Sequence, residues 1–315
     1  MTAFTRFAWG VLGYNLLVVA WGAFVRATGS GAGCGKHWPT CNGAIVPRAP
    51  GVETAIEFTH RATSGIALLL VVALVVWAFR AFPRGHPARR ASAWAMGFMI
   101  AEALVGAGLV LFGWVAKDAS AGRGWAMAVH LTNTFLLLGA LALAADWSRH
   151  PGGFAAAGRR SVAAALASAG AVVLLAGVTG AIAALGDTLF PASSFAEGLR
   201  QETAVEASLL LRLRLLHPFA AIAAGAMILA AARIALRARP EPRVRAAALA
   251  GAALVATEIA LGVGNVLLLA PVWLQLVHLL VADLVWLSLV LLASASLAPG
   301  GAALRAAAPQ PAAVA

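Results

Sequence analysis

Apolar runs of about 20 residues recur along almost the whole chain, and this repetition limits the folds open to it. A run of about 20 apolar residues is what an α-helix needs to cross a lipid bilayer. Hydrophobic residues make up 62% of the chain and charged residues only 11%, and the mean hydropathy is +0.88. Several runs of this length in one chain are typical of membrane proteins. The sequence therefore predicts an all-α integral membrane protein.

We expect eight membrane-spanning helices. Their expected ranges are 8–27, 59–82, 92–115, 125–147, 160–185, 209–236, 245–270 and 272–296. The first run is too long for the core of a signal peptide and lacks a small-residue cleavage site, so we expect it to be retained as a helix. The segment after Leu297 is rich in Ala and Pro. It predicts a disordered cytoplasmic tail over residues 298–315.

The distribution of arginine predicts how the helices are oriented. The loops after the second, fourth and sixth spans are rich in Arg and hold only two acids, Asp146 and Glu241. Such loops stay in the cytoplasm, so we expect both termini inside and the loops 28–58 and 186–208 outside. In a soluble domain a pI near 11.5 would suggest nucleic acid. Here the membrane explains the net charge of +11, and we expect no nucleic-acid partner.

An internal repeat divides the chain into two units. The run at 101–108 resembles the run at 257–264, which lies 156 positions later. Similar offsets separate three further pairs: His60 and His217, His130 and His278, and Trp21-Gly22 and Ala176-Gly177. The repeat predicts two tandem four-helix units, residues 1–152 and 153–297, with the same orientation in the membrane.

Four histidines occupy the second, fourth, sixth and eighth spans: His60, His130, His217 and His278. One histidine in an apolar helix is usually a core residue or a helix–helix hydrogen bond. These four share a similar depth near the outer surface, and two imidazoles at one depth are what six-coordinate haem iron needs. Zinc needs three or four protein ligands at one place. We therefore expect two bis-histidine haem sites, one formed by His60 and His130 and one by His217 and His278.

Glu57 distinguishes the first site from the second. It lies three residues before His60, so on a helix it projects from nearly the same face. Either it is an interfacial acid paired with Arg61, or it places a carboxylate beside the group that His60 holds. The equivalent residue before His217 is Arg214. This difference favours one catalytic site and one redox site.

Other polar residues in or beside the spans have open roles. Arginines that flank the outer ends of spans either bind haem propionates or anchor at head groups: Arg26, Arg61, Arg212 and Arg214. Glu102 and Glu258 lie within spans, and the sequence assigns them no role. Asp283 follows His278 by five residues, where it either orients a ligand or pairs within the bundle.

Both cysteines, Cys34 and Cys41, lie in the first outer loop. A disulfide can form and persist on the oxidising side of the membrane. The pair is either a structural staple over the site or a redox-active pair that exchanges electrons. We favour the staple, because closing so short a loop is easy and neither neighbourhood resembles a thioredoxin motif.

Six runs of sequence together resemble the haem A synthase family. In chain order they are GAFVRATGSGAGC, WPTCNG, EFTHR, HLTNT, LRLRLLHP and QLVHLLVADLVW, and the similarity covers about residues 8–296. The resemblance implies two pseudo-symmetric four-helix bundles. It also implies oxidation of the C8 methyl group of haem O to the formyl group of haem A, through a hydroxymethyl intermediate, in the assembly of terminal oxidases.

The same resemblance implies roles for individual residues. His217 and His278 would hold a haem B cofactor, while His60 and His130 would line the haem O site with Glu57 in a catalytic role. The cysteine pair is typical of one bacterial group, in which it is tied to redox or haem handling. Some relatives carry a second pair in the loop that corresponds to 186–208, which has no cysteine here. Electron transfer between two such pairs is therefore not expected.

The resemblance and the residues together favour a haem-modifying oxidoreductase of the bacterial cell membrane. Its haem sites would face the outer side, with haem O synthase supplying the substrate and a membrane quinone or another acceptor taking the electrons. Arg214 would contribute to binding the haem B cofactor. One alternative is a di-haem b-type cytochrome that only transfers electrons, but such proteins usually stack haems at two depths. Another is a haem exporter or chaperone, against which the difference between Glu57 and Arg214 argues.

Overall fold

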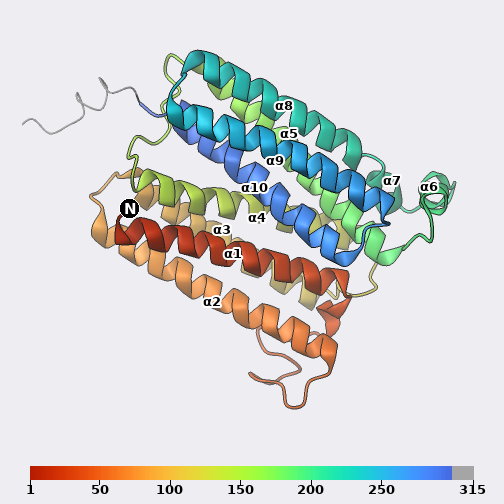
Figure 1. Ribbon diagram of the computed structural model, residues 1–315. Helices are drawn as coiled ribbons and strands as arrows, with labels where there is room; N and C mark the ends of the chain where they lie inside the picture. Colours follow the sequence, from red (N-terminus) through yellow and green to blue (C-terminus); the bar gives the residue numbers. More distant parts are fainter. Residues whose placement is uncertain (300–315) are drawn as a thin grey trace, which may run out of the picture.

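The computed structural model describes residues 1–299, and every regular element in that range is a helix (Figure 1). In chain order the elements are α1 (Ala3–Ala27), the short 3₁₀-helix η1 (Ser30–Ala32), α2 (Val52–Ala81), α3 (Pro87–Leu111), α4 (Ala121–Trp147), α5 (Arg160–Leu189), α6 (Phe195–Thr203), α7 (Leu209–Arg214), α8 (His217–Ala238), α9 (Pro242–Leu267) and α10 (Val272–Ser296). Eight helical segments are long and apolar enough to cross a membrane. The predicted all-α membrane fold with eight spans is confirmed.

The ends of several spans differ from the predicted ones for local reasons. Helix α2 begins at Val52 rather than 59, and Glu53 in its first turn interacts favourably with the partial positive charge of a helix N-terminus. Helix α9 ends at Leu267 instead of continuing to 270. Leu269 and Ala270 have positive φ angles, which no helix residue adopts, and they turn the chain into α10.

The sixth predicted span is interrupted near its outer end. Helix α7 stops at Arg214 and α8 starts at His217, with Pro218 in its first turn. Proline has no backbone N–H to bond to the carbonyl four residues before it, so a continuous helix through Pro218 would be unfavourable. The sequence analysis also missed α6. Its N-cap is Ser194, whose side chain accepts a hydrogen bond from the backbone N–H of Glu197.

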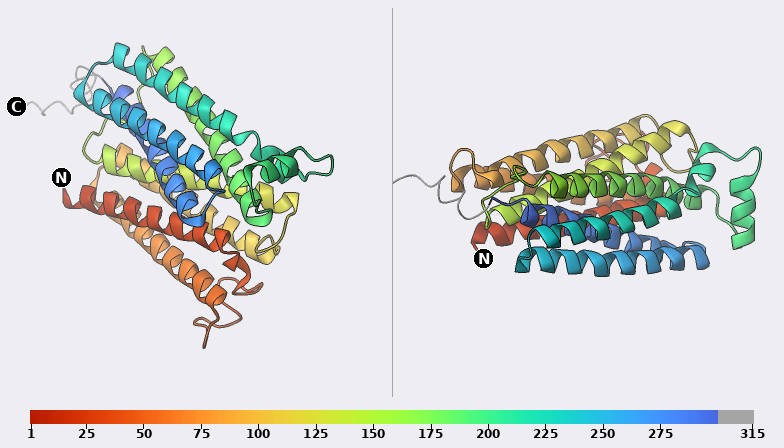
Figure 2. Two further views of the ribbon diagram at one scale, coloured as in Figure 1. Left: turned by 45° about the vertical axis from the view of Figure 1, so that its right-hand side comes forward. Right: turned by 90° about the horizontal axis from the view of Figure 1, so that it is seen from above.

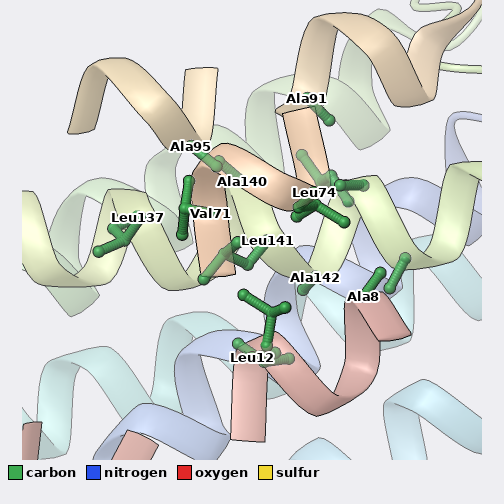
Figure 3. Packing of buried hydrophobic residues seen from close by; sticks show 14 of the residues in the cluster. Ala8, Leu12, Val71, Leu74, Ala91, Ala95, Leu137, Ala140, Leu141 and Ala142 are labelled. Atoms are coloured by element: carbon green, nitrogen blue, oxygen red, sulfur yellow. The ribbon is translucent and has the colours of Figure 1, made fainter. Parts of the chain in front are cut away.

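The buried apolar residues form two main clusters, one largely in α1–α4 and one largely in α5 and α8–α10. Figure 3 shows the first, where Ala8 and Leu12 of α1 face Leu74 of α2 and Leu141 of α4. In the first group, α1 and α3 each contact both α2 and α4; in the second, α5 and α9 each contact both α8 and α10. Helices α2 and α4, and likewise α8 and α10, thus lie on opposite sides of their group. The pseudo-symmetry and the domain boundaries stay predictions.

Helix α4 joins the two groups, because it packs against both α5 and α10. Near its end, the buried Asp146 accepts a hydrogen bond of 2.6 Å from Ser294 of α10 and one of 2.8 Å from Arg243 of α9. A buried carboxylate needs such donors to offset its lost hydration. Asp146 therefore ties α4 to the second group at this end.

The two ends of the helices carry different segments (Figure 2). The N-terminus lies at one end, and the 28–51 loop, α6 and α7 lie at the other. Most of the predicted tail, residues 300–315, lies outside the described residues. The predicted tail begins at Ala298, which lies within the described residues. Ala298 accepts hydrogen bonds from Arg159 and Arg239, so disorder is not observed there. Which end faces the cytoplasm stays a prediction.

Candidate functional site

The four histidines of the long helices lie near the starts of α2, α4, α8 and α10. These helix starts are at the end that carries the 28–51 loop and α6 (Figure 1). His60 and His130 lie in the third turns of α2 and α4. His217 is the first residue of α8, and His278 lies in the second turn of α10. All four side chains are half-buried. The helices thus bring four imidazoles to one end of the molecule.

In the second group, the rings of His217 and His278 are close together. Their centroids are 6.2 Å apart and their planes meet at 77°. Two metal–nitrogen bonds of about 2 Å each, plus the distance from nitrogen to ring centre on both sides, require about 6 Å between centroids. This separation would allow His217 and His278 to hold a haem iron between them.

A glycine makes room for one histidine in each group. A Cβ atom on Gly22 of α1 would lie 2.9 Å from Cε1 of His60, and one on Gly180 of α5 would lie 2.9 Å from Cε1 of His217. No larger residue fits at either place without moving the ring. Gly177, which the repeat pairs with Gly22, does not make room for a histidine. It packs against an aromatic ring of α4 instead.

Two carboxylates from neighbouring helices contact two of the imidazoles. Oε1 of Glu102, on α3, lies 3.0 Å from Nδ1 of His130. Oε1 of Glu258, on α9, lies 3.1 Å from Nδ1 of His278. Both contacts are close, although the atoms are not aligned for a regular hydrogen bond. In each case the Nδ1 side of the ring faces a carboxylate, which leaves Nε2 for another partner.

The other two imidazoles differ from each other. Nδ1 of His217 lies 3.2 Å from the carbonyl oxygen of Ala176 and 3.3 Å from Oγ1 of Thr179. Nδ1 of His60 is buried and has no hydrogen-bond partner within residues 1–299. Three of the four rings thus have their Nδ1 atom in a polar contact, as metal-ligating histidines do.

Glu57 is buried, and both of its carboxylate oxygens are bound. Oε2 accepts a hydrogen bond of 2.7 Å from the backbone N–H of Cys34. Oε1 accepts one of 3.1 Å from Nε of Arg61, with which it also forms an ion pair. The expected pairing with Arg61 is therefore present. It does not exclude a catalytic role, because each carboxylate oxygen has two lone pairs.

The loop next to Glu57 is closed by a disulfide bond between Cys34 and Cys41. Nη1 of Arg61 donates hydrogen bonds of 2.5 and 2.6 Å to the carbonyl oxygens of His37 and Thr40 in this loop. Arg61 therefore holds the disulfide loop and Glu57 together. The predicted disulfide is confirmed, and the contacts fit a staple over the first site.

Arg214 is bound by two carboxylates. Its Nη1 donates a hydrogen bond of 2.9 Å to Asp187 of α5, and its Nε donates to Glu202 of α6. These contacts attach α6, which has no buried residue, to the helices. The binding of a haem cofactor by Arg214 stays a prediction, and the structure adds Asp187 and Glu202 to its surroundings.

Arg26 contacts helices of the second group, and the two roles expected for it stay predictions. Its Nη1 donates hydrogen bonds of 2.6 Å to the carbonyl oxygen of Ala184 and to Oγ1 of Thr188, both on α5. Its Nη2 donates one of 2.9 Å to Gln275 of α10. Arg26 thus connects α1 to two helices of the second group.

Glu102 and Glu258 are the residues that sequence reasoning passed over. Their signal was already visible, because both fall at the same place in the repeated runs 101–108 and 257–264. Asp283 was expected to orient a ligand or to pair within the bundle. It is fully buried, and within residues 1–299 neither of its oxygens has a hydrogen-bond partner, so the pairing expectation is wrong.

The donor set fits haem better than a metal ion held by protein ligands alone. Within the described part of the chain, no group of three or more His, Cys, Asp or Glu residues is arranged to hold a metal ion. Zinc sites need such a group. Haem iron needs only two axial nitrogens, because the macrocycle supplies the rest.

Comparison with known proteins places this architecture in a family. Residues 5–290 match the COX15-CtaA family, described as cytochrome oxidase assembly protein. A Thermus thermophilus protein named protoheme IX farnesyltransferase is 51% identical over 276 residues, which cover 88% of this chain and 45% of that protein. This chain therefore spans about half the length of that relative.

Two shorter matches carry another name. Haem A synthase of Alkalihalophilus pseudofirmus is 41% identical over 98 residues, or 31% of this chain and 33% of that protein. Haem A synthase of an Exiguobacterium species is 41% identical over 104 residues, or 33% of this chain and 34% of that protein. Since the family match extends over nearly the whole chain, this protein belongs to the COX15-CtaA family of cytochrome oxidase assembly proteins.

Proposed function

We propose that this protein is a haem A synthase, an oxidoreductase that converts the C8 methyl group of haem O to a formyl group through a hydroxymethyl intermediate. Family membership and the relatives named haem A synthase support a role in haem A formation. The observation that carries the proposal is the pair of unequal histidine sites. Both lie at one end of the helices, and only the first has a buried glutamate, Glu57, one helical turn away.

His217 and His278 would hold the resident haem B. A bound haem B supplies one-electron chemistry, which suits a group that passes electrons onward. His217 would present Nε2, because its Nδ1 contacts Ala176 and Thr179. His278 would present Nε2 for the same reason, because its Nδ1 faces Glu258.

His60 and His130 would bind and orient haem O in the first site. Gly22 leaves space for the ring of His60, and Glu102 limits the rotation of the ring of His130. With water as the source of the hydroxyl oxygen, each of the two oxidations of the methyl carbon releases two electrons and two protons, so an external acceptor must take the electrons. We propose a membrane quinone as this acceptor.

Glu57 would act at the methyl carbon. Its carboxylate accepts hydrogen bonds from Cys34 and Arg61, which fix its position, and it keeps lone pairs free. With them it would take a proton from the reacting carbon or stabilise positive charge there. A positioned general base contributes about 10²–10⁴-fold to a rate.

We further propose that a haem O synthase supplies the substrate directly. The Thermus relative supports this partner, because a protein named for farnesyl transfer to protoheme IX includes a region that is 51% identical to this chain. Co-purification of this protein with haem O synthase from mild detergent tests the proposal. Failure of the two proteins to associate would contradict it.

The activity is tested by expression in a host that makes haem O but not haem A, followed by haem extraction and mass analysis. We expect haem A or the hydroxymethyl intermediate with the wild type, and at least about a hundredfold less with Glu57→Ala. Glu53→Ala is the matched control, because Glu53 is an exposed acid one turn away on the same helix. Unmodified haem B alone in every sample, with haem O supply confirmed, would favour a di-haem cytochrome instead.

A further inference from the structure

We propose that Glu102 and Glu258 are positioning residues that fix the orientation in which His130 and His278 face haem. Glu258 in addition lowers the midpoint potential of the resident haem B. The inference rests on the proposed function, because it assumes that these histidines ligate haem iron. It adds a role for two residues of the spans that neither the reaction nor the sequence motifs require.

The first observation is that the same contact occurs twice. Glu102 of α3 faces Nδ1 of His130 of α4 at 3.0 Å, and Glu258 of α9 faces Nδ1 of His278 of α10 at 3.1 Å. Both carboxylates have 19% of their side chain exposed. A chance contact between helices would not recur in both units, where the two glutamates are 156 residues apart and the two histidines 148.

The second observation is which ring nitrogen is contacted. A histidine that ligates a metal usually donates its other N–H to a carboxylate, carbonyl or water, which fixes the tautomer and the ring orientation. A proton on Nδ1, the nitrogen next to the glutamate, would leave the lone pair of Nε2 for iron. A negatively charged acceptor also makes the imidazole more basic, so it favours the oxidised state of the iron.

The third observation is that the two glutamates have different surroundings. Glu102 also accepts hydrogen bonds of 2.5 Å from Asn133 and from Thr134, both on α4. At the matching positions after His278 stand Val281 and Ala282, which have no side-chain donor.

Within residues 1–299, Oε2 of Glu258 has no hydrogen-bond partner. Glu102 therefore has two hydrogen-bond donors besides its contact with His130, while Glu258 has only its contact with His278 within the same residues. It follows that Glu258 polarises its histidine more strongly than Glu102 does. In the first group, the partner of His130 is itself held by other donors. In the second group, the contact with Glu258 alone sets the basicity of His278.

The test measures haem B content and the midpoint potential of haem B in purified protein, without measuring turnover. Glu258→Ala removes the acceptor, and we expect haem B to bind about 10- to 100-fold more weakly. Glu258→Gln keeps an acceptor oxygen of the same shape but removes the charge. We expect it to retain haem B with a low-spin spectrum, while its midpoint potential rises above that of the wild type.

Glu102→Gln is the matched control, since it makes the same change in the other group. We expect it to leave the haem B potential unchanged and to weaken the binding of added haem O. Wild-type haem content and potential in both Glu258 variants would overturn the inference while leaving the proposed function intact. Wild-type protein that holds no haem B would overturn both.

Discussion

The two histidine sites share a helical framework and differ in the segments that cover it. In the first, a disulfide loop lies over the helix ends, and a buried acid, Glu57, accepts a hydrogen bond from Cys34 of that loop. In the second, the covering segment has no cysteine, and a base, Arg214, binds the acids Asp187 and Glu202. The charge at the residue three positions before the histidine is thus reversed.

This contrast shows where the chemistry of the two sites diverges. The contacts of histidine with glutamate and with glycine recur in both groups, so the helices surround the histidines with similar partners in both. Segments outside the helices tolerate change more readily than packed helices do, and they often carry function. We infer that the helices hold haem in both sites, and that the loops decide which haem reacts.

The largest expected effect comes from removing one proposed haem ligand at a time. His278→Ala should weaken haem B binding more than about a hundredfold, since even the loss of an outer partner costs 10- to 100-fold. His60→Ala should keep haem B and lose conversion of haem O. Haem B per protein, measured after purification, checks both variants. Equal loss of haem B in the two variants would show that the sites are not distinct.

A smaller effect is expected from the ion pairs of the second site. Arg214→Met leaves Asp187 and Glu202 without their donor, which should destabilise this region by about 1 to 3 kcal/mol. Thermal unfolding and limited proteolysis of the 186–208 loop measure the change. Arg200→Met is the control, because the Arg200–Glu197 pair is largely exposed and should contribute nothing measurable. Equal protease sensitivity in both variants would mean that Arg214 does not hold α6.

The smallest effect on the second site is expected from the disulfide, whose removal separates the two roles considered for Cys34 and Cys41. Closing so short a loop is worth about 2 kcal/mol, so a staple predicts at most about a 30-fold loss of haem A formation in Cys34→Ser/Cys41→Ser. The haem B potential should not change, because the bond lies in the first group. Complete loss of activity with normal haem B content would instead favour a redox-active pair.

Much of the architecture could be predicted from the sequence, because each membrane span is a continuous run of apolar residues that hydropathy alone identifies. The break between α7 and α8 was also present in the sequence, in the form of Pro218. The amphipathic α6 was missed because a search for apolar runs passes over a helix without buried residues. Residues 300–315 lie outside the described structure.

The candidate site was less predictable, because contacts between helices depend on how each helix is rotated about its axis. The four histidines were found from their similar depth. The partners of Glu57 were not, because one of them is a backbone N–H of Cys34, which no side-chain pattern reveals. Glu102 and Glu258 show the opposite case, since the repeat had already marked them and only their contacts gave them a role.

The hydrogen bonds of Arg26 have a consequence for the proposed transfer of electrons between the two groups. At the histidine end, Arg26 of α1 joins α5 and α10. At the other end, Asp146 of α4 joins α9 and α10. The two groups are therefore fastened together at both ends, which opposes hinge motion between them. Because electron tunnelling slows steeply with separation, such a frame would keep the rate between the two haems steady while substrate enters and product leaves.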